Sequence, residues 1–328
     1  MIDTTPTDTA VSPSASQNGA NGRLPEITLP ADRLETVPAW GGATTGISHV
    51  YRPTTIAQLH DIFELAEKSG RSVGLRGGGN SYGDAALNDE NIVLDFRRMS
   101  RILAWNPDSG VITTEPGTTI SKLWQYVLED GWWPPVVTGT SATTIGGCAG
   151  MNVHGKNGYR VGPIGDSILS FDMMLPNGEI LTCSREENSD IFHAAIGGFG
   201  MLGIFTAITM QMKRVYSGLL HVETEARSNL GDMFTYFEDN VARSDYIVGW
   251  MDAFATGASL GRGDVHRADY LSPGDDPAPA QTMRLENQHL PDTMFGIVPK
   301  SSIWMFMRPF MNNLGTRLIN MAKYYAGQ

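Results

Sequence analysis

Residues 76–84 of this 328-residue chain read Arg-Gly-Gly-Gly-Asn-Ser-Tyr-Gly-Asp, and the rest of the sequence is best understood outward from this loop. Three consecutive glycines leave their backbone N–H groups unshielded, so that several of them can turn toward one point. Such a nest of amides suits phosphate oxygens, and the lack of an acidic residue between Gly77 and Tyr82 agrees with a negatively charged ligand. A tight structural turn is the alternative, because short motifs often arise by chance.

A second glycine-rich stretch occupies residues 138–157, TGTSATTIGGCAGMNVHGKN. Small and hydroxyl-bearing residues alternate with glycine, which lets a planar ring system lie against the backbone while hydroxyls and amides bond its edge. A flavin has this shape, with a polar pyrimidine rim and an apolar body. An ordinary loop rich in serine, threonine and glycine is the alternative interpretation.

A third glycine motif, GFGMLG at residues 198–203, matches the dinucleotide-binding pattern G-x-G-x-x-G. That pattern binds a dinucleotide where it follows a strand and precedes a helix. Here a helical pattern at 190–196 precedes it and an alternating strand pattern at 204–212 follows it. We therefore predict a turn at the entry of a strand, and no Rossmann site.

The segments around these loops mix helix and strand patterns without regular βαβ alternation, which predicts an α+β fold. Helices are expected at 54–70 and 119–130, each closed by a glycine, and strands at 72–75 and 92–96. Residues 101–115 and the Asn177-Gly178 pair each predict a hairpin. From about Leu219 a second region begins, with strands at 219–225, 245–254 and 258–271 and a helix at 229–242.

The two ends of the chain differ in character. Residues 1–27 are rich in Thr, Ser, Asn and Pro and are expected to form a disordered tail. Residues 302–325 carry a helix-like apolar pattern. We assign this pattern to core or interface packing and not to a membrane-surface helix, because the Lys/Arg-rich face of such a helix is missing.

Composition limits the classes of function. The net charge of −11 and the lack of a Lys/Arg block disfavour nucleic-acid binding. Cys148 and Cys183 form no metal-like pair, so that we expect no metal site and a reducing, cytoplasmic compartment. We find no signal peptide and no apolar run of the ~18 residues that a membrane span needs.

Four segments together resemble a known family. They are LRGGGNSYGDAALN (75–88), TGTSATTIGGCAGMNVHGKNG (138–158), DMMLPNGEILTCS (172–184) and ENSDIFHAAIGGFGMLGIFTAITM (187–210). Their order is typical of the vanillyl-alcohol oxidase / p-cresol methylhydroxylase (PCMH) flavoprotein superfamily. The motifs SYGD-x-A-x-N and HGKN are most similar to decaprenylphosphoryl-ribose 2-oxidases, with sterol side-chain reductases and sugar-alcohol or aldonolactone oxidases next.

The resemblance implies a two-lobed PCMH-type FAD-binding domain over residues 37–216, with lobes at about 37–100 and 101–216. An α+β substrate or cap domain with antiparallel sheet would follow over 217–328. Members of the family usually continue well past Gln328, so that we expect a C-terminally truncated chain with an incomplete cap. The resemblance also implies which residues bind FAD: Gly77, Gly78, Gly79, Asn80, Ser81, Tyr82, Thr138, Gly139, Ser141, Thr144, Gly147, Asn152, Gly155 and Ile204.

One position departs from the family pattern. Several relatives carry a histidine where this chain has Asn80, and that histidine is bonded covalently to the flavin. An amide cannot form this bond, so that we expect FAD to be bound non-covalently.

The resemblance implies an FAD-dependent oxidoreductase acting on a CH–OH group, with hydride transfer to flavin N5. The substrate would be a small molecule derived from a sugar or polyol, or a lipid-linked sugar; the oligomeric state stays open. Lys156 is the candidate for a positive charge near the flavin or the substrate, and His154 for a proton shuttle. A solvated lysine and a structural histidine are the alternatives, and Tyr159 and Asn157 are weaker candidates. Reduction of a C=C bond, or a flavin-binding module without catalysis, are the alternative functions.

Overall fold

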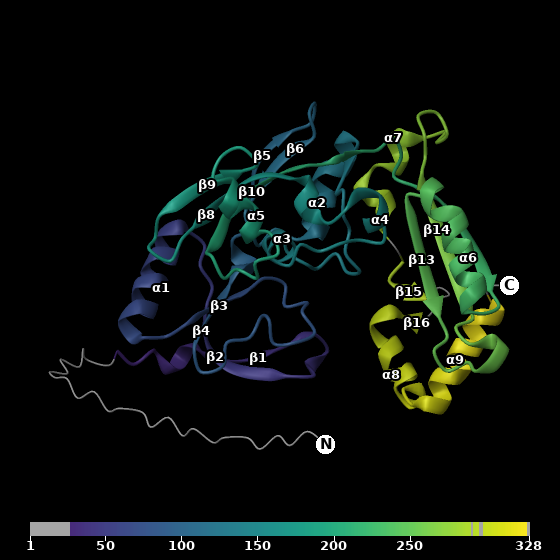
Figure 1. Ribbon diagram of the computed structural model, residues 1–328, viewed down its shortest axis with the longest axis horizontal. Helices are drawn as coiled ribbons and strands as arrows, with labels where there is room; N and C mark the ends of the chain where they lie inside the picture. The colour runs from purple at the N-terminus through teal and green to yellow at the C-terminus, as the bar shows by residue number, and fades with distance from the viewer. Residues whose placement is uncertain (1–26, 290, 295–297, 327–328) are drawn as a thin grey trace, which may run out of the picture.

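The computed structural model describes residues 27–289, 291–294 and 298–326, and its main sheets fall into three groups along the chain (Figure 1). Residues 1–26 of the expected tail lie outside the described residues. Helices and antiparallel sheets mix throughout, so that the α+β prediction is confirmed. Among the described residues, none of the helices has both the length and the apolar character that crossing a bilayer requires.

The first group is a mixed four-stranded sheet that leads directly into the glycine loop. Its order is β1-β2-β4-β3, and β4 lies parallel to both of its neighbours. Helix α1 covers it because Leu59 and Ile62 recur on one face and pack among buried side chains of β4. Thr55 begins the helix by accepting from the N–H of Gln58, and Gly70 ends it in the left-handed region at φ 63°. The elements are β1 (Leu34–Pro38), β2 (Thr45–Tyr51), α1 (Ile56–Ser69), β3 (Val73–Arg76) and β4 (Ile92–Asp95).

The second group is a five-stranded antiparallel sheet in the order β5-β6-β10-β8-β9. Its largest buried cluster joins strand residues such as Phe171 and Ile208 to helix residues such as Leu123, Cys148 and Phe192. Both predicted hairpins are present. The elements are β5 (Ile102–Asn106), β6 (Val111–Thr114), α2 (Ile120–Val127), β7 (Trp132–Trp133), α3 (Ile145–Gly150), α4 (Gly158–Val161), β8 (Ile168–Met174), β9 (Ile180–Ser184), α5 (Ser189–Ala195), β10 (Ile204–Gln211) and β11 (Lys213–Arg214).

The third group is an antiparallel sheet in the order β12-β14-β13, with α6 packed on one face through Met233 and Tyr236 against Ile247 and Val265. The strand expected at 258–271 begins later, because left-handed turns at Gly257 and Gly261 precede it. The elements are β12 (Leu220–Arg227), α6 (Leu230–Asn240), β13 (Tyr246–Met251), β14 (Gly263–Tyr270), α7 (Pro279–Thr282), β15 (Thr293–Met294), β16 (Val298–Pro299), α8 (Ile303–Met307) and α9 (Asn313–Ala326).

Helix α9 corrects the expectation for residues 302–325. Its buried face packs on the third group, where the amide of Asn320 donates to Asp252 at 2.9 Å. Leu314, Leu318 and Met321 recur at helical spacing on its other side and are exposed. The packing interpretation therefore holds for one face of the helix only.

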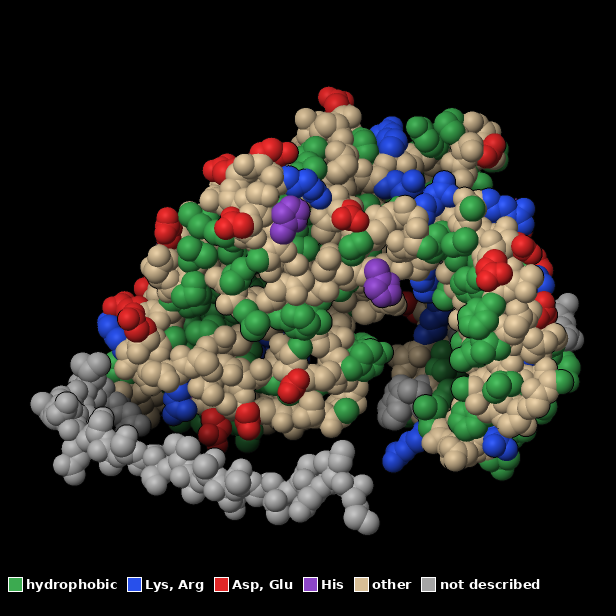
Figure 2. All heavy atoms as spheres, viewed as in Figure 1, with side chains coloured by type: hydrophobic (Ala, Val, Ile, Leu, Met, Phe, Trp, Pro, Cys, Tyr) green, Lys and Arg blue, Asp and Glu red, His purple; other side chains and the backbone are tan. Residues whose placement is uncertain are grey.

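We refer to residues 27–216 as the main body and to residues 217–326 as the cap segment. The cap segment lies beside the main body and meets it at the upper edge of Figure 1. Below this edge a hollow separates the two parts on the face shown in Figure 2. Both glycine-rich stretches lie in the main body.

Candidate functional site

A cavity of about 430 Å³ lies between the first and second groups of the main body. Three segments far apart in the sequence line it: the glycine loop after β3, the stretch around α3, and the turn that precedes β10. A cavity of this size is in the range of small-molecule and cofactor sites.

The glycine loop brings unpaired backbone donors to this cavity. Within the described residues, no N–H group from Gly77 to Ala86 donates a hydrogen bond to the protein. Gly79 has a φ of 68°, which a side chain would strain. Because unpaired donors must find partners, the loop is built to receive an acceptor-rich ligand such as a pyrophosphate.

The loop also touches the second glycine-rich stretch so closely that side chains are excluded. A Cβ atom added at Gly77 would lie 2.0 Å from Oγ1 of Thr144, and one at Gly78 would lie 2.5 Å from the carbonyl oxygen of Ala142. Thr144 is buried and caps α3 by accepting from the N–H of Gly147 at 3.4 Å. The two stretches therefore form one wall of the cavity.

The side chain of Asn80 indicates whether the cavity suits a flavin nucleotide. Its side-chain Nδ2 and Oδ1 atoms are both buried, and neither has a hydrogen-bond partner among the described residues. Asn80 lines the cavity, where its amide offers donors and an acceptor. The two unpaired side-chain atoms of Asn80 fit the polar edges of FAD. The glycine loop, which has no side chains from Gly77 to Gly79, fits its phosphates.

Arg76 was not among the predicted site residues, although it directly precedes the three glycines. Among the described residues that line the cavity it is the only charged one. Its guanidinium donates to the carbonyl oxygens of Pro38 at 2.9 Å and Ala86 at 3.4 Å. Burial lowers the pKa of Arg76, and the nearby charge of Arg97 lowers it further. The charge of Asp95 offsets these effects only in part, and a ligand with negative charge would stabilise the guanidinium further.

The apolar wall of the cavity comes mostly from residues that the sequence did not single out. Burial raises the pKa of the Cys148 thiol to about 11, so that this residue acts as a small apolar side chain. The turn at 198–203 follows α5 and precedes β10, as predicted, and contributes Phe199 and Gly200. The apolar lining includes Leu75, Phe96, Cys148, Met151, Val153, Phe199, Ile204 and Phe205.

A second cavity of about 510 Å³ adjoins the first along the chain, since Val153 lines one and His154 lines the other. His154 and Lys156 line it from the main body, and Ile247 and Val248 of β13 line it from the cap segment. The carbonyl oxygen of Lys156 accepts from the N–H of Ile247 at 3.4 Å. The exposed side chains of His154 and Lys156 therefore lie beside the cap segment, in the second cavity.

The predicted site residues divide between the two cavities. Gly139 and Gly155 line the second one together with the candidate catalytic residues Lys156 and His154. Thr138, Ser141 and Asn152 line neither and instead shape the loop, for example through the bond from the N–H of Gly165 to Oδ1 of Asn152 at 3.0 Å. The first cavity is lined by Gly77, Gly78, Gly79, Asn80, Ser81, Tyr82, Thr144, Gly147 and Ile204.

Comparison with known proteins gives a family match over the same residues. Residues 47–184 match the FAD binding domain family. This range contains the glycine loop, the second glycine-rich stretch and β8 to β9, and it ends before the cap segment.

Several curated proteins are similar over a longer range. Decaprenylphosphoryl-beta-D-ribose oxidase of Mycolicibacterium smegmatis is 31% identical over 234 residues, which cover 70% of this chain and 50% of that protein. L-gulonolactone oxidase of Mus musculus is 26% identical over 60% of this chain and 44% of its own length. D-arabinono-1,4-lactone oxidase of Yarrowia lipolytica is 25% identical over 71% of this chain and 44% of its own length. The chain thus spans about half the length of the curated relatives it matches.

Proposed function

We propose that this chain, whose residues 47–184 form an FAD-binding domain, is an FAD-dependent oxidoreductase that oxidises a CH–OH group of a sugar, polyol or lipid-linked sugar. The observation that supports it most is the adjacency of the two cavities. One has the unpaired amides and orphaned Asn80 that suit the cofactor, and the other brings His154 and Lys156 beside the cap segment. The relatives' names point to oxidation of a ribose derivative and of sugar lactones.

Each part of the site has a role in this proposal. FAD, when bound, supplies the redox chemistry by accepting a hydride. Arg76 and the N–H groups of the glycine loop hold its phosphates, and Asn80 bonds it without a covalent link. Lys156 provides positive charge that favours the electron-rich state of the site, and His154 accepts or relays the hydroxyl proton.

The cap segment completes the substrate pocket in this proposal. We assign substrate contact to the cap domain expected at 217–328, because β13 lines the second cavity. Both cysteines, Cys148 and Cys183, are free and buried, which supports the proposed reducing, cytoplasmic location.

The proposal is tested by anaerobic reduction of the bound flavin with a panel of sugars, polyols and lipid-linked sugars. Bleaching of the flavin by an alcohol substrate is the expected result. Replacing Lys156 with Met should slow this reduction, and an unchanged rate would remove Lys156 from the mechanism. Bleaching by NADPH alone would favour a reductase of C=C bonds, and a flavin that no donor reduces would favour a module without catalysis.

A further inference from the structure

The short helix α4 follows His154 and Lys156 directly, and it joins them to the cap segment. The hydroxyl of Tyr159 donates to the carbonyl oxygen of Ser244 at 3.0 Å. The guanidinium of Arg160 donates to the same oxygen at 3.3 Å and lies 3.4 Å from the carboxylate of Asp245. Both cap residues immediately precede β13, whose residues line the second cavity.

Residues 155–157, which precede α4, are held against the main body. The amide of Asn157 is buried and donates to the carbonyl oxygen of Pro135 at 2.8 Å. A Cβ atom added at Gly155 would lie 2.6 Å from Oδ1 of Asn157 and 2.8 Å from the carbonyl oxygen of Val137, so that the backbone packs tightly there. His154 and Lys156 therefore directly precede an anchor on the main body, at Asn157, and an anchor on the cap segment in α4.

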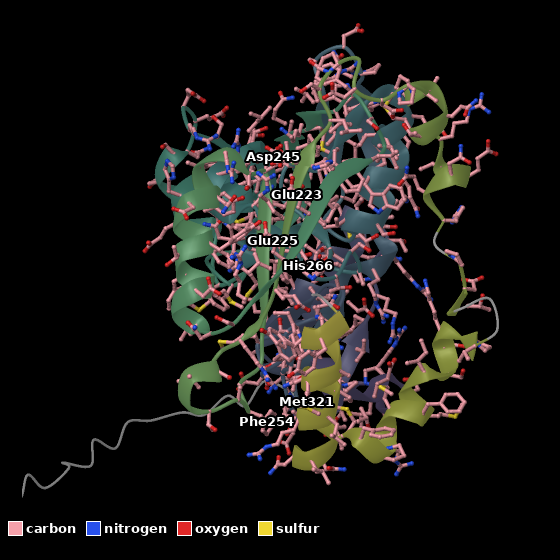
Figure 3. The ribbon with its side chains drawn as sticks, turned by 90° about the vertical axis from the view of Figure 1, so that its right-hand side faces the viewer. Glu223, Glu225, Asp245, Phe254, His266 and Met321 are labelled. Atoms are coloured by element: carbon pink, nitrogen blue, oxygen red, sulfur yellow. The ribbon has the colours of Figure 1, made fainter. Side chains whose placement is uncertain are left out.

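The cap anchor is at the end of the cap segment where the two parts meet. Asp245 lies at the upper end of the cap sheet in Figure 3, while Phe254 and Met321 lie at the opposite end. Two other contacts also join the main body to the cap segment. The ammonium of Lys213 lies 4.4 Å from the ring centre of Tyr270, and Glu129 accepts from the N–H of Leu285 at 3.1 Å. The contacts of α4 are therefore part of the junction between the cap segment and the main body.

We propose that Tyr159 and Arg160 are positioning residues that transmit the placement of the cap segment to His154 and Lys156. The inference rests on the proposed function, because it assumes that these two side chains serve the flavin or the substrate. An exposed ion pair contributes little by itself, but here three polar contacts converge on two consecutive cap residues. Burial raises the pKa of Tyr159 to about 12, so that its hydroxyl remains a donor at neutral pH.

The variants Tyr159→Phe and Arg160→Gln, alone and combined, remove these contacts without removing any residue of the glycine loop. Tyr126→Phe and Arg71→Gln are matched controls: Tyr126 is exposed on α2, and Arg71 bonds the carbonyl oxygen of Glu90 in the first group of the main body. Each holoprotein is checked for unchanged FAD content and thermal unfolding. If Arg160→Gln folds poorly, Tyr159→Phe alone carries the test, since it deletes only one hydroxyl.

The first measurement is a double-mutant cycle on the rate of flavin reduction by substrate. The combined variant should be slower by about ten- to a hundredfold, because a displacement of about 1 Å in a catalytic group has an effect of this order. In a Lys156→Met background the combined variant should cause little further loss of this rate. The reason is that the contacts of Tyr159 and Arg160 act through the segment that holds Lys156. Fully additive losses would overturn the proposal.

The second measurement needs no substrate, which separates this inference from the proposed function. The midpoint potential of the bound flavin is measured by reductive titration with dithionite and a reference dye. Loss of the Lys156 charge should lower the potential, and the combined variant should lower it in the same direction while both controls leave it unchanged. An unshifted potential in the combined variant overturns the inference, whereas a shifted potential in a protein that no alcohol reduces overturns only the proposed reaction.

Discussion

Replacing Gly77 with alanine should disrupt the FAD site by displacing Thr144 within the wall that the two glycine-rich stretches form together. The added Cβ would lie 2.0 Å from Oγ1 of Thr144, a side chain that is only 2% exposed. Thr144 must move, which costs about 1–3 kcal/mol for overpacking and about 1 kcal/mol for the lost cap of α3. We expect the free energy of unfolding of the FAD-free protein to fall by about 2 to 4 kcal/mol, the sum of these effects.

Urea unfolding of the FAD-free protein measures this stability, and fluorescence titration measures FAD binding. We expect the Kd for FAD to rise at least about tenfold, because the displaced wall lines the cofactor cavity. Gly83→Ala is the matched control in the same loop: its Cβ would meet no protein atom within 4 Å, and its φ is not positive. It should change the free energy of unfolding by less than about 0.5 kcal/mol. Wild-type stability and FAD affinity in Gly77→Ala would refute the argument from the shared wall.

Three further outcomes are expected. Burial alone would raise the pKa of Asp95, but its bonds to Arg97 and the charges of Arg97 and Arg52 lower it on balance. The free energy of unfolding should therefore decline as pH falls below about 4. Urea unfolding of Asp95→Asn should show less of this decline. Arg76→Gln should weaken binding of FAD and FMN but not of riboflavin, which has no phosphate; equal weakening of all three in fluorescence titrations would show that charge is not the cause. Acid precipitation should leave a colourless pellet and a yellow supernatant, since Asn80 forms no covalent link; a yellow pellet would contradict this.

The glycine-rich stretches that the sequence singles out line the first cavity, and what they contribute to it is local chemistry. A run of residues without side chains exposes its own amides wherever the chain goes, and the loop at 76–84 indeed carries unpaired donors. The strand-entry turn at 198–203 was also predictable, since the order of helix, turn and strand is a property of the sequence itself.

Other features depend on contacts between distant segments and left no local signal. Phe96 and Phe205 reach the cavity only because β4 and β10 come together in the fold. The many glycines of residues 138–157 predict a loop. The structure forms the helix α3 there, although three of its six residues are glycines, and Thr144 caps its N-terminus. The separation of His154 and Lys156 into a second cavity depends on β13, which is about ninety residues further along the chain.

The most direct test of the account is the visible absorption spectrum of the purified protein after incubation with FAD and removal of unbound cofactor. The account predicts the absorption bands of an oxidised flavin and an equimolar amount of FAD. Folded protein that stays colourless would contradict it, because the unpaired amides of residues 77–86 would then serve no such ligand.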